Sequence, residues 1–210
     1  MSFRNHDEIF IKAFGDNVKN LNIELPALDV NHVIHTNYAV DPPNFVLTKT
    51  QLWDMECRKA AAPDIFIPTV VKAGTVEKFP SSFGTDAEYF TRIGDQITWK
   101  DPWTAVMVIE HVKVDHKNQA VTFVGAEEWT APDGRLFCAG KGQPLFHVEH
   151  GVIGDDENRP LNTWRITHLN IDGNDPEMGE CFKAMGERKY LPEYVEIYIR
   201  DVLGVSLVRK

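Results

Sequence analysis

The strongest constraint on the fold of this chain is a series of segments rich in β-forming residues between about residues 86 and 170. Residues 104–116 (TAVMVIEHVKVDH) and 119–130 (QAVTFVGAEEWT) form the clearest pair, and Lys117-Asn118 suits a two-residue turn between them. Residues 131–134 (APDG) carry a second turn signal. We therefore expect a meander of long antiparallel strands, which continues through residues 135–140, 144–153 and 161–170.

Helical patterns precede and follow this predicted sheet. Thr48 and Gln51 fit a capping box, in which a hydroxyl and an amide side chain satisfy free backbone N–H groups at the start of a helix. Residues 31–40 suit a strand, and residues 63–84, which hold several prolines and glycines, suit an irregular loop with one short strand over a pocket. We expect helices over residues 6–20, 49–61, 176–187 and after Pro192.

This order of elements predicts an α+β fold, a curved antiparallel sheet packed by N- and C-terminal helices. It resembles the small cone-shaped folds of the NTF2-like type, in which helices close one side of a curved sheet over a pocket; a calycin-like barrel is the main alternative. A length of 210 residues favours a single domain over residues 1–210. Open concave sheets of either kind bind small, largely apolar molecules, so the resemblance implies a small-molecule-binding domain.

Charge and composition argue against several kinds of partner. A formal net charge of −9 repels phosphate backbones, so we expect no nucleic-acid partner. No apolar run approaches the roughly 20 residues that span a bilayer, and the first ten residues lack the apolar core of a secretory signal, so we expect no membrane partner. Three widely spaced cysteines, Cys57, Cys138 and Cys181, predict no disulfide framework. A reducing, cytoplasmic location fits best.

Strand alternation indicates where a site would lie, because side chains two residues apart share a face. With the turn at residues 117–118, Val112 pairs with Phe123 and Glu110 pairs with Gly125. Continuing the count pairs Val108 with Glu127 and Val106 with Trp129. One face then holds Phe123, Trp129 and several valines, with the two carboxylates of Glu110 and Glu127 among them.

A second hairpin, closed around residues 154–160, gives a similar face. It pairs His147 with Ile166, Glu149 with Trp164 and Leu145 with His168. All six side chains would share one face, while Phe146, Val148, His150, Arg165 and Thr167 would lie on the other. A slip of one residue would reshuffle both sets.

These side chains suit general acid–base chemistry. A carboxylate among apolar groups has a raised pKa, and a histidine beside a carboxylate exchanges protons near pH 7. A structural role is the alternative for each, since buried histidines and carboxylates also occur as satisfied core groups. We predict His147, Glu149, His168 and Glu127 as catalytic residues, and Trp164, Trp129, Glu110 and Phe123 as substrate-binding residues.

The motifs of several other chemistries are missing. No glycine-rich phosphate loop, G-x-S-x-G elbow or HExxH helix occurs, so we expect neither a nucleotide nor any other cofactor. We assign no metal. The imidazoles of His147 and His168 with the carboxylate of Glu149 nevertheless match the ligand set of many non-haem iron sites, which keeps a metal-dependent enzyme open.

The function predicted from these features is that of a cofactor-independent lyase or isomerase. It would be a dehydratase, decarboxylase or double-bond isomerase acting on a small aromatic, polyketide-like or terpenoid substrate. A carrier that binds the same ligand without chemistry is the alternative from another class. We also predict a homo-oligomer, because Tyr194, Tyr198 and Ile199 on the last predicted helix, and an extra face of the sheet, need cover.

Overall fold

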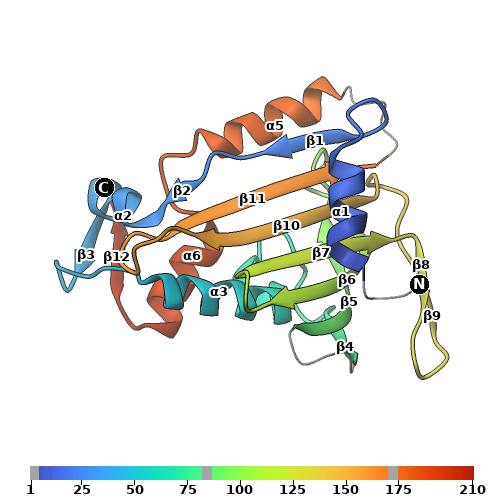
Figure 1. Ribbon diagram of the computed structural model, residues 1–210, viewed down its shortest axis with the longest axis horizontal. Coiled ribbons are helices and arrows are strands. Elements are labelled where there is room, and N and C mark those ends of the chain that lie inside the picture. Colours follow the sequence, from blue (N-terminus) through green and yellow to red (C-terminus); the bar gives the residue numbers. More distant parts are fainter. Residues whose placement is uncertain (1–4, 82–86, 170–174) are drawn as a thin grey trace.

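The computed structural model describes residues 5–81, 87–169 and 175–210. Its centre is a long antiparallel sheet with the strand order β1-β11-β10-β7-β6-β5-β4 (Figure 1). The predicted meander and the α+β fold class are thus confirmed. The strands of this sheet are β1 (Leu21–Glu24), β4 (Glu77–Ser81), β5 (Glu88–Ile97), β6 (Ala105–Asp115), β7 (Ala120–Ala126), β10 (Phe146–Ile153) and β11 (Leu161–His168), with β2 (Leu28–Asp29) paired to β11.

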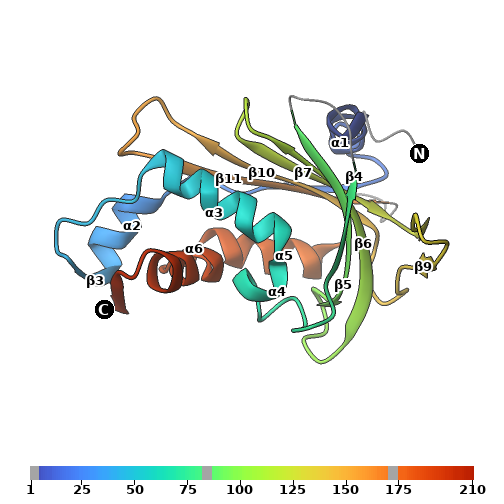
Figure 2. The same ribbon diagram turned by 90° about the horizontal axis from the view of Figure 1, so that it is seen from below.

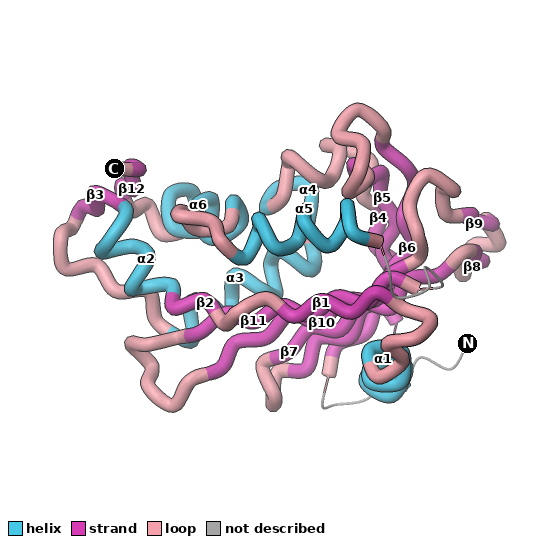
Figure 3. The backbone as a smooth tube through the Cα atoms, turned by 90° about the horizontal axis from the view of Figure 1, so that it is seen from above, coloured by secondary structure: helices cyan, strands magenta, loops and turns pink. Residues whose placement is uncertain are grey.

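Helices cover the two faces of the sheet unequally. Figure 2 shows the sheet curving around the helices on its concave face, while α1 lies on the convex face; Figure 3 shows the same division from the other side. The concave-side helices are α3 (Lys49–Ala61), α4 (Pro63–Phe66), α5 (Pro176–Gly186) and α6 (Glu193–Ile197), which continues as a π-helical turn (Tyr198–Val202). The convex-face helix α1 spans His6–Phe14. At the margins lie α2 (Val30–Asn37), the small pair β3 (Tyr38–Asp41) with β12 (Ser206–Arg209), and the hairpin β8 (Glu128–Thr130) with β9 (Leu136–Cys138).

Two local predictions were wrong. The segment 31–40 is mostly the helix α2, because the Asp29 side chain accepts the His32 N–H at its start and the Asn31 amide bonds the Leu47 backbone. Capping and tertiary hydrogen bonds outweigh the weak strand propensity of this segment. In the segment 63–84, the predicted short strand is present as β4, but the segment also contains the helix α4, which the prediction missed; residues 82–84 lie outside the described residues.

The sheet is open, so the calycin-like barrel was wrong. β1 and β4 stand at opposite ends of the strand order, and the described strands form no ladder that joins them. α3 and the C-terminal helices lie on the concave face of this open sheet (Figure 2).

The interior between sheet and helices is a single large apolar cluster. Phe123 and Ile166 from the strands meet Met55 from α3 and Phe182 from α5, and each of these side chains is buried. Tyr198 and Ile199 are buried within the chain as well, so they need no cover from a second copy. The homo-oligomer stays a prediction that rests on Tyr194 and on the extra sheet face. Among the described residues, no helix combines the length and apolar character needed to cross a bilayer.

The predicted capping box is confirmed and can be tested directly. The Thr48 hydroxyl accepts the Gln51 N–H at 3.1 Å, and the Gln51 side chain accepts the Thr48 N–H at 3.0 Å. Thr48→Ala removes the first of these bonds and should lower the free energy of unfolding by about 1 kcal/mol in urea denaturation. Gln51→Glu keeps an acceptor oxygen and should stay close to wild type. Equal stability of Thr48→Ala and wild type would contradict this role.

Candidate functional site

The registers of the two predicted hairpins decide which side chains meet inside the protein. In the first hairpin, the pairs Val112–Phe123 and Glu110–Gly125 are confirmed. In the second, the predicted register was wrong by one residue, because β10 and β11 pair Phe146 with His168 and Glu149 with Arg165. This slip exchanges the faces of β10 relative to β11.

His147 and Glu149 therefore lie on the convex face, away from Trp164 and His168. His147 is 5% exposed, and its Nδ1 accepts the Gly125 N–H at 3.1 Å. Glu149 forms an ion pair with Arg165, whose guanidinium lies over the Phe10 ring of α1. The predicted placement of both side chains in one cavity with Trp164 was wrong, and in this structure Glu149 instead holds the Arg165 guanidinium that packs on α1.

The other predicted residues divide between the faces. Glu110 and Phe123 lie in the concave interior, as do Trp164 and His168. The predicted pairing of Glu127 and Trp129 with β6 was wrong, because the β6–β7 ladder ends at Ile109–Ala126 and the chain bends at Glu127. Glu127 is exposed there, and Trp129 packs against Phe79 and Phe137 in a separate small cluster.

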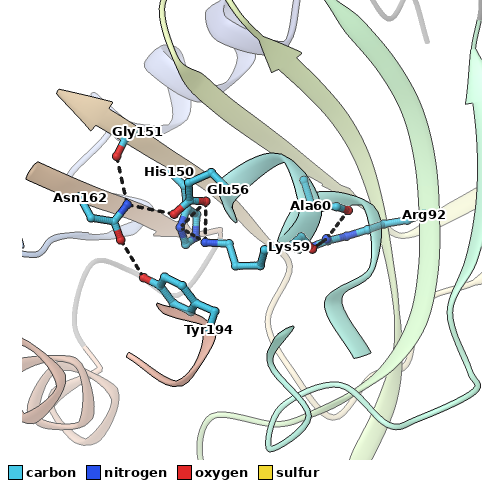
Figure 4. Close-up of polar contacts among 8 residues, drawn as sticks. All are labelled: Glu56, Lys59, Ala60, Arg92, His150, Gly151, Asn162 and Tyr194. Carbon is cyan, nitrogen blue, oxygen red and sulfur yellow. Dashed lines mark hydrogen bonds and ion pairs between the residues drawn. The ribbon is translucent and has the colours of Figure 1, made fainter. Parts of the chain in front are cut away.

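A buried polar network that the sequence analysis missed lies at the centre of the concave interior (Figure 4). Lys59 Nζ lies 2.6 Å from Glu56 Oε2 and 2.8 Å from His150 Nδ1. Asn162 Nδ2 donates to Glu56 Oε1 at 2.9 Å, and Tyr194 Oη donates to Asn162 Oδ1 at 3.0 Å. Lys59 Nζ also stands 3.9 Å from the centre of the Tyr194 ring. α3, the sheet and α6 thus meet through one set of hydrogen bonds.

A signal for part of this network exists in the sequence. Glu56 and Lys59 are three residues apart and fall on the same side of the 49–61 helix as the apolar stripe that includes Leu52 and Met55. Charged residues inside an apolar stripe need buried partners. His150 was assigned to the wrong face by the register error, so no partner was visible.

Burial and neighbouring charges set the protonation of the network. Burial alone would raise the pKa of Glu56, but Lys59 and His150 outweigh it and hold that pKa at about 2. Burial, and then Lys59, lower the pKa of His150 to about 4 against the opposing effect of Glu56. Burial also lowers the pKa of Lys59, while Glu56 raises it. Near pH 7 Glu56 is therefore ionised and His150 is neutral.

These charges specify the tautomer of His150. An ammonium group only donates hydrogen bonds, so a charged Lys59 requires His150 Nδ1 to accept, and the ring proton then sits on Nε2. The His150 side chain retains 12% exposure, whereas that of Glu56 has none. His150 is thus the member of the triad through which the network can meet a ligand.

Arg92 holds the end of α3 in place beside the network. Its Nη1 donates to the Ala60 carbonyl at 2.8 Å and to the Lys59 carbonyl at 3.3 Å, in the last turn of α3 (Figure 4). Its Nε donates to Glu110 Oε2 at 2.7 Å, and its guanidinium stands 4.5 Å from the Phe123 ring centre. Glu110 therefore acts on α3 through Arg92.

Three aromatic rings stand close to the His150 ring. Phe123 and Trp164 have ring centres 5.8 and 5.7 Å from the His150 ring, and Tyr194 stands at 6.3 Å. Beyond Trp164 lies a second group of rings, formed by Trp99, His168 and Phe182. This wall suits a flat, unsaturated molecule better than a branched or charged one.

The described residues offer no group of three or more His, Cys, Asp or Glu side chains arranged to hold a metal ion. The three side chains that the sequence analysis kept open as metal ligands lie on different faces, with His168 on the concave face and His147 and Glu149 on the convex face.

A hollow of about 20 Å³ lies elsewhere, between β6, β7 and residues 139–146, and is large enough for about one water molecule.

Comparisons with known proteins show a fold but no family. No family model and no curated protein matches the chain. The structure of dicamba monooxygenase bound to 3,6-dichlorosalicylic acid is similar at a TM-score of 0.50 and 11% identity, covering 88% of this chain and 51% of that one. Two other structures are less similar. The Zhui aromatase/cyclase from Streptomyces sp. R1128 has a TM-score of 0.47 and 11% identity, covering 87% of this chain and 96% of that one. The major latex-like protein 151 from Panax ginseng has a TM-score of 0.36 and 14% identity, covering 80% of this chain and 97% of that one.

The fold is of the helix-grip type, in which an open antiparallel sheet curves around C-terminal helices. The predicted NTF2-like cone was therefore wrong in its finer layout. The reason lies in the last part of the chain, since α5 and α6 follow the final long strand and fill the concave face (Figure 2).

The Lys59–Glu56 pair yields a stability prediction. Lys59→Met leaves the Glu56 carboxylate buried without a counter-charge, which should lower the free energy of unfolding by about 3–5 kcal/mol. In the double variant Lys59→Met/Glu56→Gln, a neutral amide replaces the carboxylate and still accepts from Asn162, so most of that loss should be recovered. Urea denaturation of both variants measures the difference, and an equal loss in both would contradict the ion-pair assignment.

His168 yields a pH prediction. Its side chain has 0% exposure, and burial lowers its pKa to about 4. The unfolded chain takes up the proton near pH 6.5, so the folded state is fully stabilised above that pH and loses stability as the pH falls toward 4. Between pH 7 and pH 5 this histidine should account for about 2 kcal/mol of lost unfolding free energy.

Urea denaturation of wild type and His168→Phe at the two pH values tests this assignment. The variant should lose about 2 kcal/mol less than wild type between pH 7 and pH 5. Equal urea dependence of the unfolding free energy in both proteins would show that the same transition is compared. An unchanged pH dependence in the variant would contradict the assignment.

Proposed function

We propose that this protein is a small-molecule enzyme in which His150 exchanges a proton with a ligand on the concave face, backed by Lys59 and Glu56. The reaction class is that of a cofactor-independent lyase or isomerase, and dehydration is the reaction that the network suits best. The proposal moves the acid–base role from His147 and Glu149, on the convex face, to His150 and Glu56.

The observation that carries the proposal is the buried triad of Glu56, Lys59 and His150 inside an apolar, aromatic-walled interior. Two buried ion pairs, Glu56–Lys59 and Arg92–Glu110, cost desolvation energy that an apolar core of the same volume would avoid. Groups with strongly shifted pKa values in such positions are typical of functional sites.

The triad can deliver a proton and recover it. His150 Nε2–H gives its proton to a hydroxyl group of the ligand, and the carbon–oxygen bond breaks to release water. Lys59 passes a proton to His150 Nδ1 as Nε2 loses its own, and Glu56 stabilises the charged form of Lys59 before the transfer. When the neighbouring carbon of the ligand loses its proton, the relay takes that proton back, so the net change is loss of water.

The ligand class follows from the walls of the site. Phe123, Trp164 and Tyr194 present rings to His150, and a planar conjugated molecule makes the largest contact with them. A carbonyl group in conjugation with the breaking bond would make the neighbouring C–H acidic. We therefore propose a small aromatic or polyketide-like hydroxyketone as substrate.

A non-catalytic carrier is the second candidate function. The polar atoms of Asn162 and Tyr194 already bond within the network, so a ligand is not needed to satisfy them. A carrier would bind the same aromatic molecules and leave them unchanged.

The probe 3-hydroxy-1-tetralone tests the proposal, because loss of water converts it to fluorescent 1-naphthol. Wild-type protein should accelerate this conversion at pH 7, and His150→Gln should lower the turnover number by at least about 100-fold. His147→Gln is the matched comparison, a buried histidine on the same strand that faces the other side.

The two variants separate the possible outcomes. Loss of turnover in His150→Gln alone supports the relay. Loss in His147→Gln alone would instead support the role predicted from the sequence. Saturable binding of the probe with no turnover in wild type would support the carrier, and no binding at all would contradict both candidate functions.

A further inference from the structure

Among the residues that the structure describes, four buried polar atoms without hydrogen-bond partners lie together in the ring cluster beside the relay. They are Trp99 Nε1, Trp164 Nε1, His168 Nδ1 and His168 Nε2. Buried polar groups in native proteins are nearly always paired, so such a concentration needs an explanation. Thr167, on the convex side of β11, also has an unpaired hydroxyl but does not belong to this group.

The rings that carry these atoms lie close together. Trp99 stands 6.1 Å from Trp164 and 6.3 Å from His168, measured between ring centres. They come from two parts of the chain: Trp99 follows β5, and Trp164 and His168 lie on β11. The Trp164 ring is also next to His150, which makes this cluster continuous with the proposed relay.

We propose that Trp99, Trp164 and His168 form the subsite that recognises the oxygen atoms of a planar ligand. This inference rests on the proposed function, since it concerns the same concave face, and it names the polar chemistry that the ligand must carry. The two indole groups only donate hydrogen bonds, while a neutral imidazole donates one and accepts one.

This set of groups selects one ligand chemistry. The indole N–H groups fit a carbonyl oxygen, which accepts two hydrogen bonds, and the imidazole acceptor nitrogen fits a hydroxyl group, which donates one. Asp175, which interacts electrostatically with His168, pairs with Lys100 at 2.5 Å, and Lys100 also lies 3.6 Å from Glu177. Two carboxylates already compensate this ammonium group, so it does not favour an ionised acidic ligand. The subsite therefore suits a neutral aromatic hydroxyketone, in agreement with the substrate class proposed for the relay.

Phe182 of α5 occupies the space that such a ligand would take. Its side chain has 0% exposure, and its ring centre lies 4.8 Å from Trp99, 5.5 Å from Trp164 and 5.6 Å from His168. Within α5, Met178 and Phe182 are the fully buried side chains, and Met185 is partly buried against the core. A ligand ring that replaces the Phe182 ring would keep the apolar contacts and add hydrogen bonds to the unpaired nitrogens.

Binding of an inert probe series tests the subsite without any reaction. 6-Hydroxy-1-tetralone carries a ketone and a phenol and cannot lose water, 1-tetralone lacks the phenol, and tetralin lacks both oxygens. We expect the affinity of wild-type protein to fall about tenfold at each step of this series. His168→Phe keeps an aromatic ring and removes both nitrogens. In this variant, the loss of affinity on removing the phenol should disappear, while the loss on removing the ketone should remain.

Nuclear magnetic resonance locates the contact. On addition of 6-hydroxy-1-tetralone, the indole N–H resonances of Trp99 and Trp164 should move downfield. The indole N–H resonances of Trp53 and Trp103 should stay in place, because Trp53 already bonds His116 and Trp103 is 92% exposed. Trp→Phe variants assign the resonances. Phe182→Leu makes room in the cluster and should tighten binding of the probe by about tenfold.

Equal affinities along the series would overturn the subsite. So would a His168→Phe variant that still loses affinity when the phenol is removed. Trp99 and Trp164 resonances that do not move at saturation would also contradict it. These outcomes differ from a failure of the relay. If His150→Gln binds the series as wild type does but turnover of the reactive probe is the same in both, the relay fails and the subsite stands.

Discussion

The ammonium group of Lys59 is the point on which the centre of this structure depends. It sits between the Glu56 carboxylate and the His150 imidazole, over the Tyr194 ring, with almost no contact with solvent. An uncompensated charge at this depth is strongly unfavourable. Placing Lys59 here therefore requires α3, β10 and α6 to adopt one arrangement, and that arrangement defines the concave interior.

The polar interior has two parts with different partners. Arg92 and Glu110 bind the last turn of α3 to the sheet and have all their charge compensated within the protein. The cluster around Trp99 and His168 contrasts with them, because its nitrogens are buried but unpaired. A paired network can be explained by packing alone, whereas unpaired nitrogens in an aromatic setting indicate a missing partner. This difference is the reason for placing ligand recognition at the second cluster.

Much of the fold could be predicted from local patterns. The capping box at Thr48, the turn at residues 117–118 and the pairing of Glu110 with Gly125 all depend on neighbouring residues, and all are confirmed. The second hairpin was harder, because the polar loop of residues 154–160 allows more than one closure. A shift of one residue there moved His147 away from the interior and brought His150 into it.

The sequence by itself determined the α+β class, the antiparallel meander and the presence of Glu110, Phe123, Trp164 and His168 on strands beside an interior. Alternation of side chains and turn chemistry are local properties, so they can be read without coordinates. Only the tertiary structure decided that the sheet stays open, that α5 and α6 fill it, and that Glu56 and Lys59 meet His150. Those contacts join residues about a hundred positions apart in the chain, and no local pattern specifies which distant side chain will satisfy a buried charge.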